Sequence, residues 1–263
     1  MEVVYKTLKF KINDRIITIW LNRPMVHNAF NSTMLEELAD ILEKVNHNED
    51  IRVVLFTGEG KSFSAGADLK WMKEIINYSY EKNLKDSEKI SEVFYKIYTL
   101  NKPVISAING AAIGGGMGFV AASDIVISSD KAQFSLSEVK IGVVPACISP
   151  YLLRKSGEGA LKELFLSGRR FFPEEALKIN LVNLIVDHKN LMEIAEIKAR
   201  ELLANGPNAM AMCKKLFRDV PEMDLRTAYN HTSDLIASLR ISAEAQEGMK
   251  AFLEKRKPKW GKS

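Results

Sequence analysis

Two stretches rich in glycine and alanine lie in the first half of the chain: Ser62-Phe63-Ser64-Ala65-Gly66-Ala67-Asp68 and Asn109-Gly110-Ala111-Ala112-Ile113-Gly114-Gly115-Gly116-Met117-Gly118. Each follows an apolar run, at 51–57 and 104–108, that is typical of a buried strand. Both are therefore predicted to be strand-to-helix turns at the carboxyl edge of a sheet, where open α/β folds bind ligands. Small residues let a ligand approach the backbone, and N–H groups at a helix start lack partners. Two such groups converging on one point would bind a developing oxyanion.

Strand and helix patterns continue on both sides of these turns. We expect a hairpin from 4–10 and 16–21, a helix over 34–45 capped by Ser32 or Thr33, and a strand at 124–128. Residues 69–100 are predicted to be helical but interrupted, with a polar, mobile stretch at 77–85. Helices are expected at 158–167, 173–179, 190–204, 207–218, 224–240 and 243–256, and one strand within 181–186. Alternating strands and helices predict an α/β fold with a parallel-rich sheet.

Composition and charge narrow the function classes. The chain has 263 residues, of which 46% are hydrophobic and 27% charged, as in ordinary soluble globular proteins. A net charge of +4 with dispersed lysines and arginines argues against a nucleic-acid partner. The sequence shows no membrane span and no signal peptide, which predicts a cytoplasmic protein. Cys147 and Cys213 form no metal-binding or disulfide pattern.

The glycine cluster allows more than one interpretation by itself. Gly114, Gly115 and Gly116 match neither the dinucleotide-binding nor the phosphate-loop motif. Their structural alternative is tight packing of a helix against a sheet, which also requires small residues.

An organisational boundary near 195–205 separates a β/α part, residues 1–200, from a helical part, residues 201–263.

The order of the motifs carries a family resemblance. Residues 64–69, then 109–116 with Asp124 and Ile125, resemble the signature of the crotonase, or enoyl-CoA hydratase/isomerase, family. Residues 134–145 resemble its second signature, and residues 247–256 its C-terminal helix. The resemblance runs from the first hairpin to Trp260. It implies an α/β fold with a ββα superhelix core and a helical C-terminal region that forms trimers, commonly paired into hexamers.

The resemblance also implies roles for individual residues. The backbone N–H groups of Ala65 and Gly115 would hold the carbonyl oxygen of an acyl-CoA thioester. No metal and no cofactor is implied, because coenzyme A belongs to the substrate. The residues implied to line the CoA site are Ser64, Ala65, Gly66, Ala67, Asp68 and Gly115, joined by Phe252 and Lys255, often from a neighbouring subunit.

Only one of the two glutamates that the hydratase branch uses is present. Glu138 matches the second glutamate, and Gly118 stands where the first is expected. Apolar neighbours would raise the pKa of Glu138 and suit it to proton transfer, although an exposed structural glutamate is the alternative. One carboxylate and one oxyanion hole suffice for isomerisation, for hydration, or for decarboxylation of a glutaconyl-type thioester. A noncatalytic CoA- or RNA-binding relative is a further alternative.

A finer resemblance favours hydration. Residues 65–72, 136–139, 145–151 and 246–248 are similar to the bacterial methylglutaconyl-CoA hydratase branch of leucine breakdown. A branched substrate with a second carboxylate requires a cation or hydroxyl group in its acyl pocket. The candidates in the sequence are Lys70, Lys140, Ser149, Tyr151 and Arg154, each of which is more often a surface or helix-cap residue.

Overall fold

The computed structural model describes residues 4–260. The strands are β1 (Leu8–Asn13), β2 (Ile16–Leu21), β3 (Val53–Gly58), β4 (Val104–Ile108), β5 (Ala111–Ile113), β6 (Ile125–Ser129), β7 (Gln133–Ser135), β8 (Arg170–Phe171) and β9 (Leu184–Val186). The α-helices are α1 (Ser32–His47), α2 (Leu69–Ile75), α3 (Tyr80–Thr99), α4 (Met117–Ala122), α5 (Ser149–Ser156), α6 (Glu158–Ser167), α7 (Pro173–Lys178), α8 (Leu191–Leu203), α9 (Pro207–Asp219), α10 (Leu225–Arg240) and α11 (Ala243–Leu253). Short 3₁₀ turns are η1 (Pro24–Val26), η2 (Gly114–Gly116), η3 (Ser137–Ile141), η4 (Ala146–Ile148), η5 (His188–Asn190) and η6 (Val220–Glu222).

Two sheets form the centre of the molecule. The larger has the order β1-β2-β3-β4-β6-β9, antiparallel only at β1–β2 and parallel elsewhere. The smaller has the order β5-β7-β8, and single bridges from Ser64 to Ala112 and from Phe30 to Ala67 extend it. Every residue of β3 and of β4 is buried, as expected for central parallel strands covered on both faces. The predicted α/β fold is confirmed.

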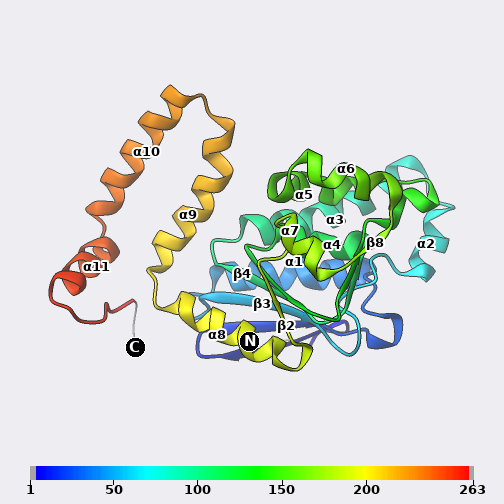
Figure 1. The fold of residues 1–263 in the computed structure, drawn as a ribbon, viewed down its shortest axis with the longest axis horizontal. Coiled ribbons are helices and arrows are strands. Elements are labelled where there is room, and N and C mark those ends of the chain that lie inside the picture. Colours follow the sequence, from blue (N-terminus) through cyan, green and yellow to red (C-terminus); the bar gives the residue numbers. More distant parts are fainter. Residues whose placement is uncertain (1–3, 261–263) are drawn as a thin grey trace.

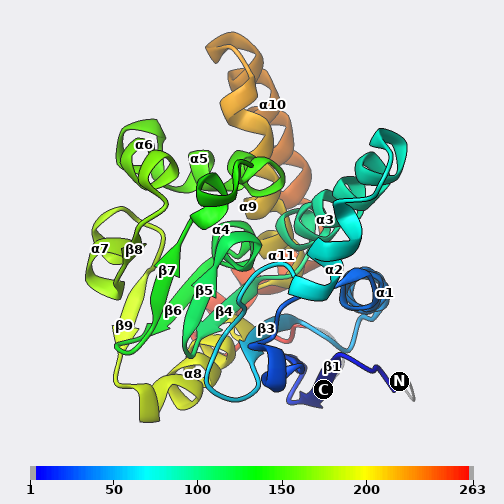
Figure 2. The same ribbon diagram turned by 90° about the vertical axis from the view of Figure 1, so that its right-hand side faces the viewer.

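Helices cover both faces of the larger sheet (Figure 1 and Figure 2). On one face α1, α3 and α4 contribute to the main core, in which Phe56, Phe94 and Phe119 are fully buried. On the other face α8 packs Leu191, Ala195 and Ala199 against alternate strand residues. Burial of these apolar faces is the main stabilising term of the fold.

The start of α1 differs from its predicted cap. The Asn31 side chain, not Ser32 or Thr33, accepts a hydrogen bond from the Met34 N–H at 3.1 Å. Ser32 is the first helical residue, and its hydroxyl donates to Glu36 at 3.0 Å. Asparagine is as good a cap as serine, so the helix begins one residue beyond Asn31.

Several other boundaries also differ from expectation. The interruption of the helical segment is confined to 76–79, and α3 already begins at Tyr80, inside the stretch predicted to be mobile. Helix α5 was not predicted, because its eight residues show too little periodicity. Strands β5, β7 and β8 are two or three residues long, too short for a period-of-two pattern. No helix within residues 4–260 is long and apolar enough to cross a membrane.

The last three helices project away from the sheets as an arm (Figure 1). The predicted division after residue 200 falls inside α8, which continues to Leu203, and α9 begins at Pro207. Glu244 of α11 accepts hydrogen bonds from the N–H groups of Asn208 and Ala209, which ties the end of the arm to its base. Residues 1–3 and 261–263 of the two predicted regions lie outside the described residues.

Candidate active site

Backbone hydrogen bonds hold the two small-residue turns together. Phe63 and Ser64 each donate an N–H to Ala111, at 3.1 and 2.9 Å, and Ile113 donates back to Ser64 at 2.9 Å. The Ser64 hydroxyl donates to the Asn28 carbonyl at 3.0 Å, and Ser64 is fully buried. The two turns therefore form one rigid unit, in which the Ser64 side chain serves as an anchor.

The Ala65 N–H is already occupied. It donates to the His27 carbonyl at 2.9 Å, so it has no free direction in which to bind a substrate oxygen. The prediction that Ala65 supplies an oxyanion donor is therefore wrong. The implied contact of its carbonyl group with CoA stays a prediction.

The Ala67 N–H occupies the position that Ala65 was expected to fill. On either side of it, Gly66 accepts from the Phe30 N–H at 2.8 Å and Asp68 donates to the Phe30 carbonyl at 2.9 Å. The Ala67 N–H itself has no acceptor within residues 4–260. Gly66 has φ +84°, and a Cβ added to it would lie 3.3 Å from the Gly115 nitrogen. This close approach places the Ala67 and Gly115 amides beside each other.

Gly115 is the second residue of the turn η2, so its N–H lies among the unpaired donors at a helical start. A Cβ on Gly115 would lie 2.5 Å from Cζ of Phe30, whose ring therefore packs directly on this glycine. Only glycine fits beneath that ring. Gly115 and Ala67 are thus the two donors that the structure brings together.

Glu138 reaches the same place from η3. A Cβ on Gly114 would lie 3.2 Å from the Glu138 Oε1, so the carboxyl group lies against the turn that carries Gly115. Its Oε2 is buried and has no hydrogen-bond partner within the described chain. Burial raises the pKa of Glu138, which confirms the expected direction. An unpaired, buried carboxyl group beside two free donors is suited to move a proton.

A second carboxylate has no room at position 118. A Cβ on Gly118 would lie 2.2 Å from Cζ of Phe94, a fully buried side chain of α3. The Phe94 ring also contacts Phe119 edge-on, with centroids 5.4 Å apart. Aromatic packing therefore fills the space that a longer side chain at 118 would enter.

Asp68 has a structural task. Its Oδ1 accepts from the Lys70 N–H at 2.7 Å, which caps α2, and its Oδ2 pairs with Arg23 at 2.7 Å. Burial acts to raise the pKa of this carboxyl group, but the Lys70 N–H and the Arg23 guanidinium outweigh it and lower the pKa. Asp68 thus stays ionised and fixes the end of the turn that begins at Ser64.

The C-terminal candidates do not join this cluster in one chain. Phe252 is 83% exposed at the end of α11, and Lys255 follows it. Figure 1 shows α11 well separated from α2 and α4. Their implied contact with CoA stays a prediction that requires a neighbouring subunit.

The proposed acyl-pocket cations and hydroxyls have different environments. Arg154 pairs with Glu222 at 2.5 Å, and the Ser149 hydroxyl donates to the Ala146 carbonyl at 2.9 Å. Tyr151 is buried, and burial raises its pKa to about 12, so it remains a hydrogen-bond donor at neutral pH. Lys70 and Lys140 are exposed. Among residues 4–260 no cluster of three His, Cys, Asp or Glu side chains suits a metal ion.

Sequence reasoning missed three residues here: Ala67 as a donor, Phe30 over Gly115, and Phe94 against Gly118. Ala67 lies in the quoted turn, but the spacing of small residues does not show which N–H is already bonded. Phe30 and Phe94 come from segments distant in sequence from the glycines they contact. Only the folded chain shows these contacts.

Proteins of known family are similar to this chain. Residues 11–263 match the enoyl-CoA hydratase/isomerase family profile. A short-chain-enoyl-CoA hydratase of Clostridium acetobutylicum is 33% identical, covering 92% of this chain and 93% of that protein. A carnitinyl-CoA dehydratase of Escherichia coli is 34% identical, covering 97% of this chain and 98% of that protein. The crystal structure of an enoyl-CoA hydratase from Shewanella pealeana superposes with a TM-score of 0.93 at 37% identity, covering 97% and 96%. The chain therefore belongs to the enoyl-CoA hydratase/isomerase family.

Proposed function

We propose that this enzyme adds water to an α,β-unsaturated acyl-CoA thioester, using Glu138 as its only acid–base group. The observation that carries the proposal is the buried, unpaired Glu138 Oε2 beside the turn that bears Gly115. The Ala67 and Gly115 N–H groups would hold the thioester oxygen. A pair of fixed donors in a partly buried site stabilises the enolate as charge moves onto that oxygen.

The reaction then needs one proton in transit. The Glu138 carboxylate takes a proton from water while the water oxygen bonds to the β-carbon. The C=C electron pair shifts toward the carbonyl and forms the enolate, which Ala67 and Gly115 stabilise. Glu138 returns the proton to the α-carbon, so the carboxylate is regenerated. The raised pKa of Glu138 suits this cycle, because burial makes the carboxylate a stronger base toward water.

Isomerisation of an enoyl-CoA is the second candidate. It also needs one base and one oxyanion hole, and of the two glutamates that the hydratase branch uses only Glu138 is present, because Phe94 packs on Gly118. A glutaconyl-type decarboxylase would require even less, and a noncatalytic relative would not require the unpaired Glu138. Relatives named as a hydratase and a dehydratase favour water addition or removal.

For the acyl group we propose a branched substrate with a second carboxylate, such as 3-methylglutaconyl-CoA. Support comes from the resemblance of residues 65–72 and 145–151 to that branch and from three uncommitted groups, Lys70, Lys140 and the protonated Tyr151. No cofactor other than the CoA of the substrate is proposed.

One assay tests both parts of the proposal. The purified protein is given 3-methylglutaconyl-CoA, crotonyl-CoA and a 3-enoyl-CoA, and hydration and isomerisation products are separated. Water addition fastest with 3-methylglutaconyl-CoA is expected. Turnover of the 3-enoyl substrate alone would rule out hydration, whereas a strong preference for crotonyl-CoA would rule out only the branched acyl group.

We also propose that the active protein is a trimer, or a hexamer of two trimers. The arm supports this, because it exposes large apolar side chains on the outside of the molecule, at Phe217, Leu225, Ile241, Phe252 and Leu253. If a neighbouring subunit covered these side chains, Phe252 and Lys255 of one subunit would also reach the CoA bound to the next.

A further inference from the structure

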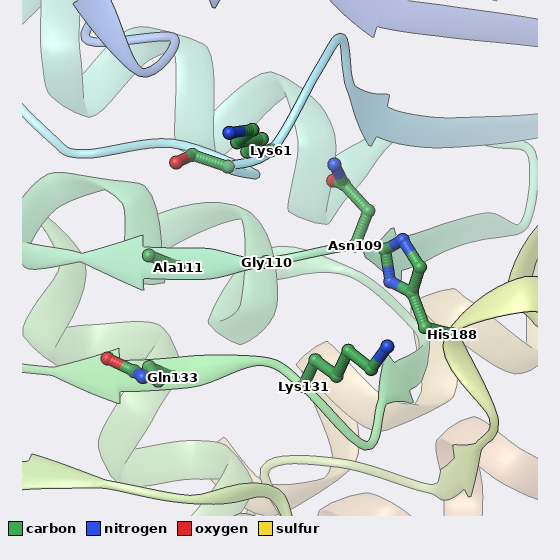
Figure 3. A pocket seen from close by; sticks show the side chains of 8 residues that line it. Lys61, Asn109, Gly110, Ala111, Lys131, Gln133 and His188 are labelled. Atoms are coloured by element: carbon green, nitrogen blue, oxygen red, sulfur yellow. The ribbon is translucent and has the colours of Figure 1, made fainter.

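A pocket with a volume of about 340 Å³ opens at the small sheet, and the proposed function does not use it. Figure 3 shows the side chains that surround it. They come from the loop after β3, the starts of β5 and β7, and η5, and chiefly include Lys61, Asn109, Gly110, Lys131, Gln133 and His188. The volume falls in the range of small-molecule sites.

The pocket and the oxyanion turns lie at opposite ends of the same strands. Ala111 pairs with Gln133 where the parallel strands β5 and β7 begin. Ile113 ends β5, and Gly115 lies in the turn η2 directly beyond that end. Lys61 likewise precedes Ala67 by six residues. Ala67, Gly115 and Glu138 are not among the residues that line the pocket, so it is a second site.

Neither lysine of the pocket forms an ion pair within the described chain. Within residues 4–260 no carboxylate lies within 4.0 Å of the Lys61 or Lys131 ammonium group. The nearest acidic residue in sequence, Asp130, directs its Oδ1 to the His188 N–H at 2.9 Å. Two unpaired ammonium groups around one concavity raise the local positive potential and favour an anion.

Two further side chains complete the lining. The Gln133 Oε1 accepts from Arg170 at 3.0 Å, and its NH₂ group has no acceptor within residues 4–260. The His188 Nδ1 is paired with the Ser129 hydroxyl at 3.0 Å, which orients the ring. In Figure 3 the Lys131 side chain extends along the pocket toward that ring.

The wall of the pocket is rigid. A Cβ on Gly110 would lie 2.1 Å from the Lys61 carbonyl oxygen, so the two backbones are in contact there. The Asn109 side chain donates to the Gly60 carbonyl at 2.9 Å and accepts from the Gly58 N–H at 3.1 Å. A wall fixed before binding reduces the ordering cost that a ligand would otherwise bear.

We propose that this pocket binds a small phosphate monoester through the Lys61 and Lys131 ammonium groups. A tetrahedral dianion accepts several N–H donors at once and pairs strongly with ammonium groups. The remaining volume would hold a compact polar group such as a sugar.

The test is calorimetric titration of the full-length protein with ribose 5-phosphate, inorganic phosphate and glutarate. The variant Lys61→Gln/Lys131→Gln removes the two cations from the pocket. The variant Lys6→Gln/Lys11→Gln removes two exposed cations at the opposite end of the larger sheet and serves as the matched control.

Ribose 5-phosphate is expected to bind more tightly than the other two probes. The pocket variant should weaken it at least about tenfold, because each lysine contributes a charge-assisted contact. Saturating free CoA and the control variant should leave the affinity unchanged. The proposal is overturned by absent binding, by equal affinity in the pocket variant, by displacement with CoA, or by tighter binding of glutarate or inorganic phosphate.

Discussion

At the scale of single residues, one backbone hydrogen bond decides which amides can act on a substrate. Ala65 and Ala67 are two positions apart, have identical side chains and lie in the same turn. The Ala65 N–H is bonded to His27 at 2.9 Å, whereas the Ala67 N–H has no acceptor in the described chain. The difference is invisible in the composition of the turn and follows from the way the loop at 23–30 packs beside it.

Replacing single amides by esters tests this assignment, because lactic acid in place of alanine deletes the N–H and keeps the side chain. At Ala67 we expect the rate to fall about 10²- to 10³-fold, as for loss of an oxyanion donor. At Ala65 we expect near-normal turnover and a loss of about 1 kcal/mol of stability from the broken bond to His27. Steady-state kinetics and thermal unfolding of both proteins check this; a larger rate loss at Ala65 would reverse the assignment.

Glu138→Gln tests the carboxyl group. We expect kcat to fall about 10²- to 10⁴-fold, the usual worth of a general acid–base group. The pKa of Glu138 is raised by burial, so the folded state holds this proton more tightly than the unfolded chain does. Its contribution to stability is therefore lost as pH rises from about 4.5 through the folded pKa.

The glutamine variant should consequently be more stable than the wild type at pH 7 and show no advantage in acid. Unfolding curves across pH, with the exposed Glu88→Gln as the control, measure this. Wild-type activity in Glu138→Gln would exclude Glu138 from the mechanism, whatever its effect on stability.

At the scale of elements, the contact between α3 and α4 limits the chemistry. Phe94 of α3 occupies the space that any side chain at Gly118 of α4 would need. The helices and the glycine at 118 were both expected from sequence, but their contact was not. The single-carboxylate site is thus maintained by packing as well as by the missing side chain.

Gly118→Ala should therefore destabilise the protein by about 1–3 kcal/mol through overpacking. In Phe94→Ala the added methyl group gains room, so the double variant should lose less than the sum of the two single losses. A double-mutant cycle from denaturant unfolding measures the coupling. Additive losses would show that the two side chains do not compete for the same space.

The start of α1 provides a prediction about capping. Asn31→Ala should cost about 1 kcal/mol, because it removes the acceptor of the Met34 N–H. Ser32→Ala should cost less, because the hydroxyl contacts only the exposed Glu36 side chain. Chemical unfolding of the two variants ranks them, and a greater loss in Ser32→Ala would restore serine as the cap.

At the scale of the whole molecule, the arm formed by α9, α10 and α11 projects away from the two sheets (Figure 1). Phe252 and Leu253, at the end of the arm, are 83% and 80% exposed, whereas the apolar side chains of the core are buried. Apolar side chains this exposed are a typical subunit interface. The proposed trimer would therefore depend on the arm. The oxyanion turns would depend on the core.

Phe252→Asp/Leu253→Asp should dissociate the assembly and weaken acyl-CoA binding while the protein stays folded. Light scattering, circular dichroism and substrate titration measure the three properties. The matched control is Phe172→Asp/Leu166→Asp, which changes the same residue types at exposed positions outside the arm. An unchanged molecular mass in the arm variant would contradict a trimer built through α11.

The sequence by itself determined the α/β class, most element positions and the two small-residue turns, and it made Glu138 the candidate acid–base group, because periodicity and short motifs act locally. Only the tertiary structure decided that Ala67 rather than Ala65 offers its amide, that Phe94 closes the space at Gly118, and that Asp68 is paired with Arg23. Each of these depends on contact between segments far apart in the chain. Hydrogen bonds and close packing are satisfied over the whole molecule, so a local pattern cannot show which partner each group finds.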